Sequence, residues 1–483
     1  MFDQRGTSPK NASRLVCFLI SILLFWGTTA YGTTAQQTRT IDSLMSTLHE
    51  RGQFNGSVLV AVQGRIIYRN AFGPANFETK TKLTPETPFC LASVTKQFTA
   101  MAIMMLAERK KLSYDDAVAK YIPEFSRSSQ TVKITIRQLL THSSGIPDYG
   151  DLGIDDSNLT QKQLVTDLLK QVSSFNQPGQ KYRYSNAGYA LLAIVVQNVS
   201  KQSFGDFLEE SIFKPLGMNS TFTYDSPQKK NSQTAIGYNQ FGARDDVNPT
   251  AVPGDGGVYS TVDDLFKWDQ ALYTDKLVSQ STLAAAFVPG SVQEGGSTYG
   301  FGWNVANAGG EKYVWHTGST AGFRAFIERR LTSRVTVILL TNRGNSKRLE
   351  INDAILNTLG GKPYVLPKMS GAEKLYKTIR ESGVQTAIQM YSSLAKGSDY
   401  DLSELELNTL GYQLLYGDKR VSDAVAIFKL NTTEYPASSN AFDSLGEAYQ
   451  TEGEKDLSIK SYQNAIRLDP TNGHAAEMLK KLR

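Results

Sequence analysis

The sequence predicts an α+β fold followed by a helical repeat at the carboxyl end. Strand-like segments occur near both ends of the first 360 residues, a mainly helical region lies between them, and a pattern with a period of 34–35 residues begins near residue 411. Because strands and helices do not alternate one by one, the order favours a sheet with segregated helices over repeated βαβ units.

The amino end is typical of an export signal. Lys10 and Arg14 precede an apolar run over residues 15–26, and small residues follow as far as Ala35. A run of about 12 residues is short for a bilayer span but suits the apolar core of a secretory signal. We therefore predict that residues 1–35 are a signal peptide, that the mature chain is periplasmic or secreted, and that it keeps no stable membrane span. A buried helix or an uncleaved anchor is the alternative.

Composition excludes several classes of function. The chain has 483 residues, of which 40% are apolar and 20% charged, and its formal net charge is +5. The net charge is small and the sequence contains no dense Lys/Arg run, so a nucleic-acid partner is not predicted. Removal of the signal would leave Cys90 as the only cysteine, which excludes an internal disulfide; we expect Cys90 to be buried. The four histidines lack metal-ligand spacing, so neither a metal site nor another cofactor is predicted.

The first domain is expected to open with a helix and a hairpin. Residues 41–51 have the pattern of a short amphipathic helix. Residues 56–62 and 65–71 are rich in β-branched side chains and are separated by Gln63-Gly64, which predicts a β-hairpin. Residues 95–112 predict a long helix that is apolar on most faces, as is typical of a helix at the centre of a domain.

The remaining elements of this domain follow the same order. Residues 112–232 are expected to mix helices with long loops, including residues 138–149, 164–172 and 187–199, and strands are expected over 299–304, 312–315, 325–331 and 334–342. The last two strands are expected to pair in antiparallel fashion. The sheet therefore takes strands from both ends of residues 36–362, which we predict to be one domain.

Three short motifs lie in this domain in a fixed order. Ser93 and Lys96 have the spacing SxxK and open the apolar helix, Tyr184 and Asn186 form a YxN motif, and His316 begins the sequence His-Thr-Gly beside a strand. Single copies of such motifs are weak signals, because SxxK recurs at residues 211–214, 226–229 and 393–396, and YxN at residues 68–70. The set built on Ser93 has the order and local context that the chemistry needs.

Ser93 and Lys96 can form a nucleophile and its base. A hydroxyl at the amino end of a helix lies where the helix dipole favours negative charge. Lys96 lies three residues later and therefore shares a helix face with Ser93. Partial desolvation would lower the pKa of the lysine enough for it to take the serine proton. Considered alone, a helix cap and a solvated lysine would explain the pair as well.

Tyr184 and Asn186 can serve the proton transfer and the substrate. Their spacing places both side chains on one side of an extended or tightly turned segment. A phenol held between Lys96 and another cation would be pushed toward phenolate and could relay a proton to the leaving group. Asn186 offers a donor and an acceptor for a substrate amide. A simple turn is the structural alternative.

The third motif is expected to form the substrate-binding edge. His316, Thr317, Gly318 and Ser319 follow a strand-like segment, as if on an edge strand. Gly318 would let a substrate backbone come close, and the hydroxyls of Thr317 and Ser319 could hold a substrate carboxylate. The backbone N–H groups of Ser319 and Ser93 are the candidate oxyanion hole.

The carboxyl end has the period of a helical repeat. Gly411 and Gly446 are 35 residues apart, and Pro436 and Pro470 are 34 apart. This period matches the helix–turn–helix unit of tetratricopeptide repeats. We predict such repeats over residues 401–483, after a linker with one possible degenerate unit over residues 363–400. The tail either braces the first domain or binds a protein partner in a peptide groove.

Taken together, the motifs resemble those of the penicillin-recognising serine hydrolases, in the branch of class C β-lactamases, D-alanyl-D-alanine carboxypeptidases and related esterases. The resemblance covers roughly residues 40–360 and extends to supporting stretches at residues 139–146, 256–261 and 299–303. It implies a five-stranded antiparallel sheet flanked by helices, with an all-helical lobe across the cleft. It also implies that Ser93 forms the acyl-enzyme, that Lys96 and Tyr184 transfer protons, and that Asn186 positions the substrate.

One position departs from the class C pattern. Those enzymes usually carry Lys-Thr-Gly where this chain has His316-Thr317-Gly318, and the histidine form looks more like certain D,D-carboxypeptidases and D-aminopeptidases. We therefore predict cleavage of D-amino-acid peptides or related amides, with β-lactam or ester hydrolysis as alternatives and a non-enzymatic binding scaffold as a further one. With His316 as a fourth catalytic residue, we expect an ionisation near pH ~6–7 that His316→Lys removes.

Overall fold

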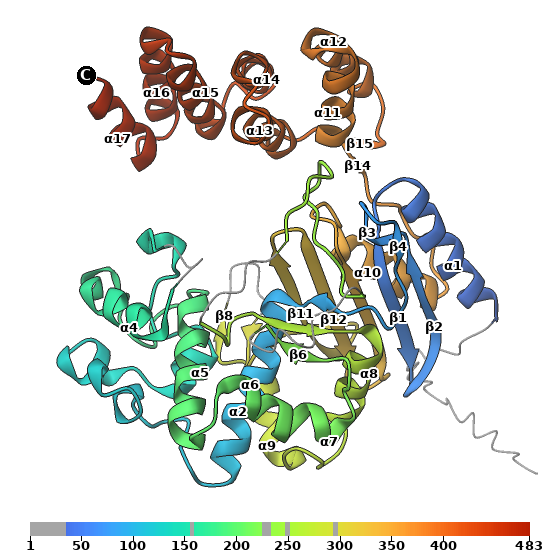
Figure 1. The fold of residues 1–483 in the computed structure, drawn as a ribbon, viewed down its shortest axis with the longest axis vertical. Helices are drawn as coiled ribbons and strands as arrows, with labels where there is room; N and C mark the ends of the chain where they lie inside the picture. The colour runs from blue at the N-terminus through green and yellow to red at the C-terminus, as the bar shows by residue number, and fades with distance from the viewer. Residues whose placement is uncertain (1–34, 155–158, 225–232, 247–251, 293–297) are drawn as a thin grey trace, which may run out of the picture.

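The structure is a computed structural model that describes residues 35–154, 159–224, 233–246, 252–292 and 298–483. Nearly all of the predicted signal peptide lies outside these residues. The described chain consists of an α+β part and a tail of helices, which lies at the top of Figure 1. None of the described helices is both long and apolar enough to cross a membrane.

One antiparallel sheet forms the centre of the α+β part. Within the described residues it has eight strands in the order β2-β1-β13-β12-β11-β10-β9-β8 (Figure 1). Its long strands are β2 (Arg65–Phe72), β1 (Gly56–Val62), β13 (Val335–Thr341), β12 (Phe323–Arg330) and β11 (Glu311–Thr320). The predicted sheet with strands from both ends of the domain is confirmed. It is wider than five strands because β10 (Asn304–Ala308), β9 (Thr298–Tyr299) and β8 (Ser291–Val292) extend it.

The predicted hairpin is confirmed at β1 and β2. Gln63 and Gly64 have φ angles of 51° and 76°, and a two-residue loop with two positive φ values matches the twist of antiparallel strands. Every residue of β1 and of β13 is buried. This continuous burial means that both faces of the sheet are covered at these strands.

Helices cover the two faces of the sheet. On one face, α1 (Ala35–Glu50) and α10 (Arg348–Leu359) pack against alternate strand residues such as Val58 and Val60. The intervening residues Leu59 and Ala61 face the larger core, which contains α2 (Lys96–Glu108) and α8 (Val262–Ala271). The first helix begins six residues earlier than the expected position 41.

A helical lobe lies beside the second face of the sheet. It is built around α2 and α5 (Asn186–Ser200), with α3 (Ile136–Leu140) and α4 (Gln161–Lys170) packed alongside (Figure 1). In α2, the residues from Lys96 to Leu106 are all buried, which confirms a helix at the centre of the domain. Ser93 and Asn186 therefore stand at the starts of two helices that pack together.

The tail consists of helices stacked in sequence order. They are α11 (Gly371–Ser382), α12 (Val384–Leu394), α13 (Glu404–Tyr412), α14 (Val421–Glu434), α15 (Ser439–Glu452), α16 (Lys455–Leu468) and α17 (Gly473–Leu482). A Cβ atom on Gly411 would lie 2.5 Å from the Phe428 ring, and one on Gly446 would lie 2.8 Å from the Tyr462 ring. The recurring glycines thus allow the same helix–aromatic contact in two successive units. The tetratricopeptide assignment stays a prediction.

Candidate active site

Ser93 lies in a sharp turn at the entrance to α2. The turn is the 3₁₀ helix η1 (Ala92–Thr95), so the α-helix begins at Lys96 rather than at Ser93. Ala92 has a φ of 47°, in the left-handed region that residues with a side chain rarely adopt. Ser93 is half-buried, whereas the other residues of η1 are buried. The turn therefore presents the Ser93 hydroxyl at the surface of a packed helix end.

Lys96 lies beneath Ser93 and is fully buried. Its Nζ lies 2.9 Å from Ser93 Oγ, 2.7 Å from Asn186 Oδ1 and 2.8 Å from the Asp255 carbonyl oxygen. Burial lowers the pKa of Lys96 to about 8, although the charges of Asp255 and Asp148 oppose this shift. In the neutral amine, two N–H groups can still serve Asn186 and Asp255 while the lone pair faces the Ser93 hydroxyl. The site can therefore hold a base against the nucleophile.

Asn186 is held by a carboxylate that sequence analysis missed. Asp148 accepts hydrogen bonds from Asn186 Nδ2 and from its backbone N–H, both at 2.8 Å. The preceding residue, Ser185, caps α5 by accepting from the N–H of Gly188. With its amide nitrogen fixed in this way, Asn186 aims its oxygen at Lys96. Asp148 lies in a loop that contains no recognisable motif, so no sequence pattern indicated its contact with Asn186.

Tyr184 completes the group around Lys96. The Lys96 ammonium lies 4.9 Å from the centre of the Tyr184 ring, and the His142 ring packs 4.3 Å away on centroids. Burial raises the pKa of Tyr184 well above its usual value, although the neighbouring Ser93 hydroxyl opposes the rise. The expectation of a phenolate is therefore wrong for the free enzyme. Tyr184 is a neutral phenol that can donate and accept a proton.

The third motif lies where β11 loses a neighbour. The β10–β11 ladder ends at the pair Asn304–Trp315, whereas β11 continues to Thr320 and remains paired with β12. Within the described chain, the β10-facing edge of residues 316–320 is therefore not paired with another strand. A Cβ atom on Gly318 would lie 2.0 Å from the Leu91 carbonyl oxygen, so this edge lies directly against the turn that carries Ser93. The geometry matches the expected substrate edge.

The predicted ionisation of His316 near neutrality is wrong. The imidazole is 3% exposed, its Nδ1 lies 2.6 Å from the Thr317 carbonyl oxygen, and its Nε2 lies 2.8 Å from the Tyr299 hydroxyl. Burial, followed by the charge of Lys96, lowers the pKa of His316 to about 3. A neutral ring that donates from Nδ1 and accepts from Tyr299 satisfies both contacts. His316 therefore stays uncharged at physiological pH.

A second cation missed by sequence analysis lies at the far end of this edge. Arg348, the first residue of α10, donates from Nη2 to Ser319 Oγ at 2.7 Å. Thr317 and Ser319 are more exposed than the intervening Gly318, as expected for alternate residues of a strand. Both the hydroxyl of Ser319 and the guanidinium of Arg348 are thus available to an anionic group. Only the fold brings the two residues together.

The pH dependence of turnover follows from Lys96. Because a protonated lysine cannot accept the serine proton, we expect kcat/KM to rise with pH, with an apparent pKa of about 8, and then to level off. No step at pH ~6–7 is expected from His316, since its neutral form persists throughout this range. A steady-state profile between about pH 5.5 and 9.5 measures both points. A flat profile across pH 8 would contradict the assignment of Lys96 as the base.

The fold and these contacts define the class of the protein. A serine at a helix entrance, a buried lysine in hydrogen-bond contact and an adjacent strand edge are the parts of a serine acyl hydrolase. The Beta-lactamase family model matches residues 40–360. The chain therefore belongs to the β-lactamase family of serine hydrolases.

Similar proteins support this membership. Penicillin-binding protein 4* of Bacillus subtilis strain 168 is 35% identical over 359 residues, which cover 69% of this chain and 78% of that protein. The octameric penicillin-binding protein homologue from Pyrococcus abyssi has 28% identity and a TM-score of 0.62, and the match covers 71% of this chain and 81% of that one. A D-amino acid amidase from Ochrobactrum anthropi SV3, at 22% identity and a TM-score of 0.58 over 68% of this chain and 99% of that one, shares the fold.

Proposed function

We propose that the protein hydrolyses peptides or related amides of D-amino acids through an acyl-enzyme on Ser93. The observation that carries this proposal is the 2.9 Å contact between Ser93 Oγ and the fully buried amine of Lys96. Buried groups with shifted pKa values cluster at functional sites, and burial lowers the pKa of Lys96 to about 8 beside the half-buried Ser93 hydroxyl. The D-configured substrate class comes from the resemblance to D,D-carboxypeptidases, and the similarity to a penicillin-binding protein supports it.

Each step has a group to carry it. Neutral Lys96 takes the Ser93 proton while Oγ attacks the substrate carbonyl carbon, and the backbone N–H groups of Ser93 and Ser319 bind the resulting oxyanion. The C–N bond then breaks, and the leaving amine takes a proton through the phenol of Tyr184, which the Lys96 ammonium replenishes. Water cleaves the ester by the reverse proton path and releases the acid. Asn186 holds the substrate amide during both steps.

Arg348 indicates what the leaving group carries. Its guanidinium lies on Ser319, the same residue that supplies an oxyanion donor in this mechanism. A carboxylate bound there would be only a few bonds from the scissile carbonyl, as in a peptide whose last residue is the leaving group. We therefore propose a carboxypeptidase-type substrate with a free terminal carboxylate. Charge-assisted contacts of this kind are worth about 1.5–3 kcal/mol.

The substrate class is tested with a matched pair of peptides. For an N-acylated peptide ending in D-Ala-D-Ala, we expect Arg348→Gln to lower kcat/KM about 10- to 100-fold, and we expect little change for the same peptide with a terminal amide. The control is Arg420→Gln, which removes a surface arginine of the tail paired with Asp423. Equal losses for both peptides would contradict carboxylate recognition by Arg348.

The same enzyme preparations separate the alternative substrates. Faster turnover of a penicillin than of the peptide would identify a β-lactamase, and a preference for a simple ester would identify an esterase. Failure of all three substrates, with folding intact, would favour a binding scaffold.

We further propose that the mature protein acts outside the cytoplasm and that the tail is available to a protein partner. Both proposals extend the sequence predictions made for residues 1–35 and 401–483.

A further inference from the structure

The segment that leads into α10 is attached to the tail. Residues 342–347 join β13 to α10 and contain the cations Arg343 and Lys347, and a third cation, Arg348, begins the helix. Arg343 donates from Nη2 to Glu373 Oε2 of α11 at 2.8 Å, and Lys347 donates to Asp401 Oδ2 at 2.8 Å. Asn345 Nδ2 also donates to Glu373 Oε1. Two tail carboxylates thus hold three of the five residues that precede Arg348.

Glu373 is fixed at the start of its own helix. Ser370 caps α11 by accepting from the Glu373 N–H at 3.1 Å, and the Glu373 side chain is only 21% exposed. Burial raises the pKa of Glu373 to about 7, although the charge of Arg343 and the Asn345 amide oppose the rise. The carboxylate is therefore ionised at pH 8 and above, where it can bind Arg343 and Asn345 together.

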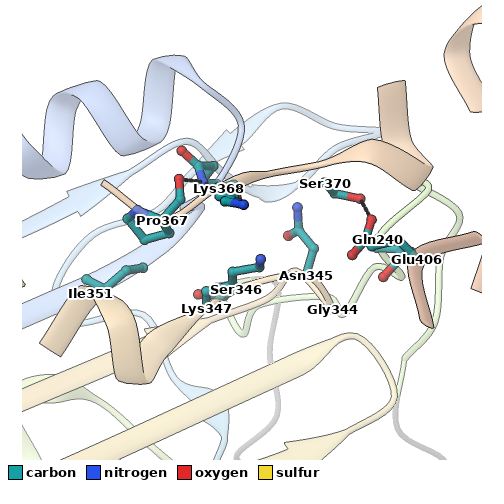
Figure 2. A pocket seen from close by; sticks show the side chains of 11 residues that line it. Gln240, Gly344, Asn345, Ser346, Lys347, Ile351, Pro367, Lys368, Ser370 and Glu406 are labelled. Atoms are coloured by element: carbon teal, nitrogen blue, oxygen red, sulfur yellow. Dashed lines mark hydrogen bonds between the residues drawn. The ribbon is translucent and has the colours of Figure 1, made fainter. Parts of the chain in front are cut away.

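The junction is polar rather than packed with apolar side chains. A cavity of about 180 Å³ lies here. Figure 2 shows the Asn345 side chain pointing into it from the domain, and Ser370 and Glu406 facing it from the tail. Ser346 Oγ and Gln53 Oε1 are buried at its wall without a protein partner among the described residues. On the domain side, the Arg343 guanidinium also donates to the backbone oxygens of Gly52 and Gln240. Polar contacts therefore decide where the segment lies.

The tail also pairs with two of the three cations of this region and leaves the third, Arg348, without a carboxylate of the tail. Glu373 neutralises Arg343 and Asp401 neutralises Lys347, whereas Arg348 is paired with no carboxylate of the described chain. Burial, followed by repulsion from Arg324, lowers the pKa of Arg348 to about 10, and its Nε is buried with no hydrogen-bond partner in the described part of the chain. A guanidinium without a counter-charge beside the substrate edge attracts an anion more strongly than a paired one.

We propose that Glu373, assisted by Asp401, is a positioning residue for the substrate carboxylate. The tail holds residues 343–347 and occupies their two cations, so that Arg348 begins α10 beside Ser319 with its charge free for the substrate. This role rests on the proposed function, since it acts through the carboxylate contact of Arg348. The α-helical tail then contributes to substrate selection without touching the substrate.

The test compares selectivity rather than activity alone. Glu373→Gln is assayed at about pH 8.5, above the pKa of Glu373, with the D-Ala-D-Ala peptide and its terminal amide. We expect the ratio of the two kcat/KM values to fall about fivefold or more, through KM, while the amide is cleaved at the wild-type rate. Glu404→Gln is the matched control, because Glu404 bonds through its side chain to Asn440 within the tail. It should leave the ratio unchanged.

A double-variant cycle separates the two proposals. If Glu373 acts through Arg348, Glu373→Gln will change the ratio no further in an Arg348→Gln background. An unchanged ratio in Arg348→Gln alone would overturn the carboxylate contact of the proposed function. A lowered ratio in Arg348→Gln, with wild-type ratios in both Glu373→Gln and Asp401→Asn, would overturn the positioning role. Thermal unfolding of every variant shows which are folded, and Asp401→Asn replaces Glu373→Gln if the latter is not.

Discussion

Replacing Ser93 with alanine or Lys96 with methionine is expected to lower kcat/KM for the peptide substrate by at least about 10³-fold. Ser93→Ala removes the atom that forms the acyl-enzyme. Lys96→Met keeps much of the buried volume but removes the group that takes the serine proton at 2.9 Å. Steady-state rates measured near pH 8.5, where wild-type Lys96 is largely neutral, give the comparison.

The double variant shows whether the two residues act as a unit. Because the nucleophile is useless without its base, Ser93→Ala combined with Lys96→Met is expected to lose no more activity than either single variant. Tail variant Glu404→Gln is again the control for folding and assay. A Lys96→Met enzyme with more than about a tenth of the wild-type rate would require another base for Ser93.

Asp269→Ala is expected to lower the free energy of unfolding of the catalytic part by about 3–5 kcal/mol. Asp269 lies on α8 and is fully buried; its Oδ1 accepts from Arg329 Nε at 2.5 Å and its Oδ2 from Thr336 Oγ1 at 2.8 Å. These contacts tie α8 to β12 and β13. Without the carboxylate, the guanidinium of Arg329, itself 1% exposed, stays buried without its counter-charge.

A carboxylate on the same helix supplies the control. Asp263 forms a partly exposed ion pair with Arg69, so Asp263→Ala is expected to cost no more than about 1 kcal/mol. Urea unfolding, monitored through the loss of enzymatic activity, reports on the stability of the catalytic part separately from that of the tail. Equal destabilisation by the two substitutions would mean that burial of the Asp269–Arg329 pair does not decide its contribution.

Local signals made much of the fold predictable. The β1–β2 hairpin follows from two β-branched segments around a Gln63-Gly64 turn, and α2 follows from an unbroken apolar segment. The strand predicted over residues 299–304 is wrong in its middle, because the chain turns between the end of β9 at Tyr299 and the start of β10 at Asn304. The two-residue strand β8 could not be predicted, because it carries no periodicity and depends on pairing with β9. The helices α11 and α12 occupy most of residues 363–400, where a linker with one possible degenerate repeat was predicted, and one face of each is buried against neighbouring helices.

The site was predictable as a set of residue types but not in its electrostatics. The structure brings Ser93, Lys96, Tyr184 and Asn186 together, as the order of the motifs predicted. The predicted protonation states of Tyr184 and His316 were wrong, because the pKa values of both groups depend on how completely other segments bury them.

Two site residues could not have been found from the sequence. Asp148 reaches Asn186 from a loop 38 residues away, and Arg348 reaches Ser319 from 29 residues away. Neither residue belongs to a motif with a fixed spacing. Such contacts are set by the packing of helices on the sheet, which a local pattern does not encode.

The acyl-enzyme on Ser93 is tested most directly by the intact mass of the protein after rapid mixing with benzylpenicillin and acid quenching, measured beside that of Ser93→Ala. We expect that the native protein gains the mass of one penicillin molecule, that peptide mapping places the adduct on Ser93, and that Ser93→Ala gains nothing. The rate at which the adduct disappears then separates a β-lactamase from a carboxypeptidase. An adduct on another residue, or peptide turnover by Ser93→Ala at the native rate, would contradict an acyl-enzyme on Ser93.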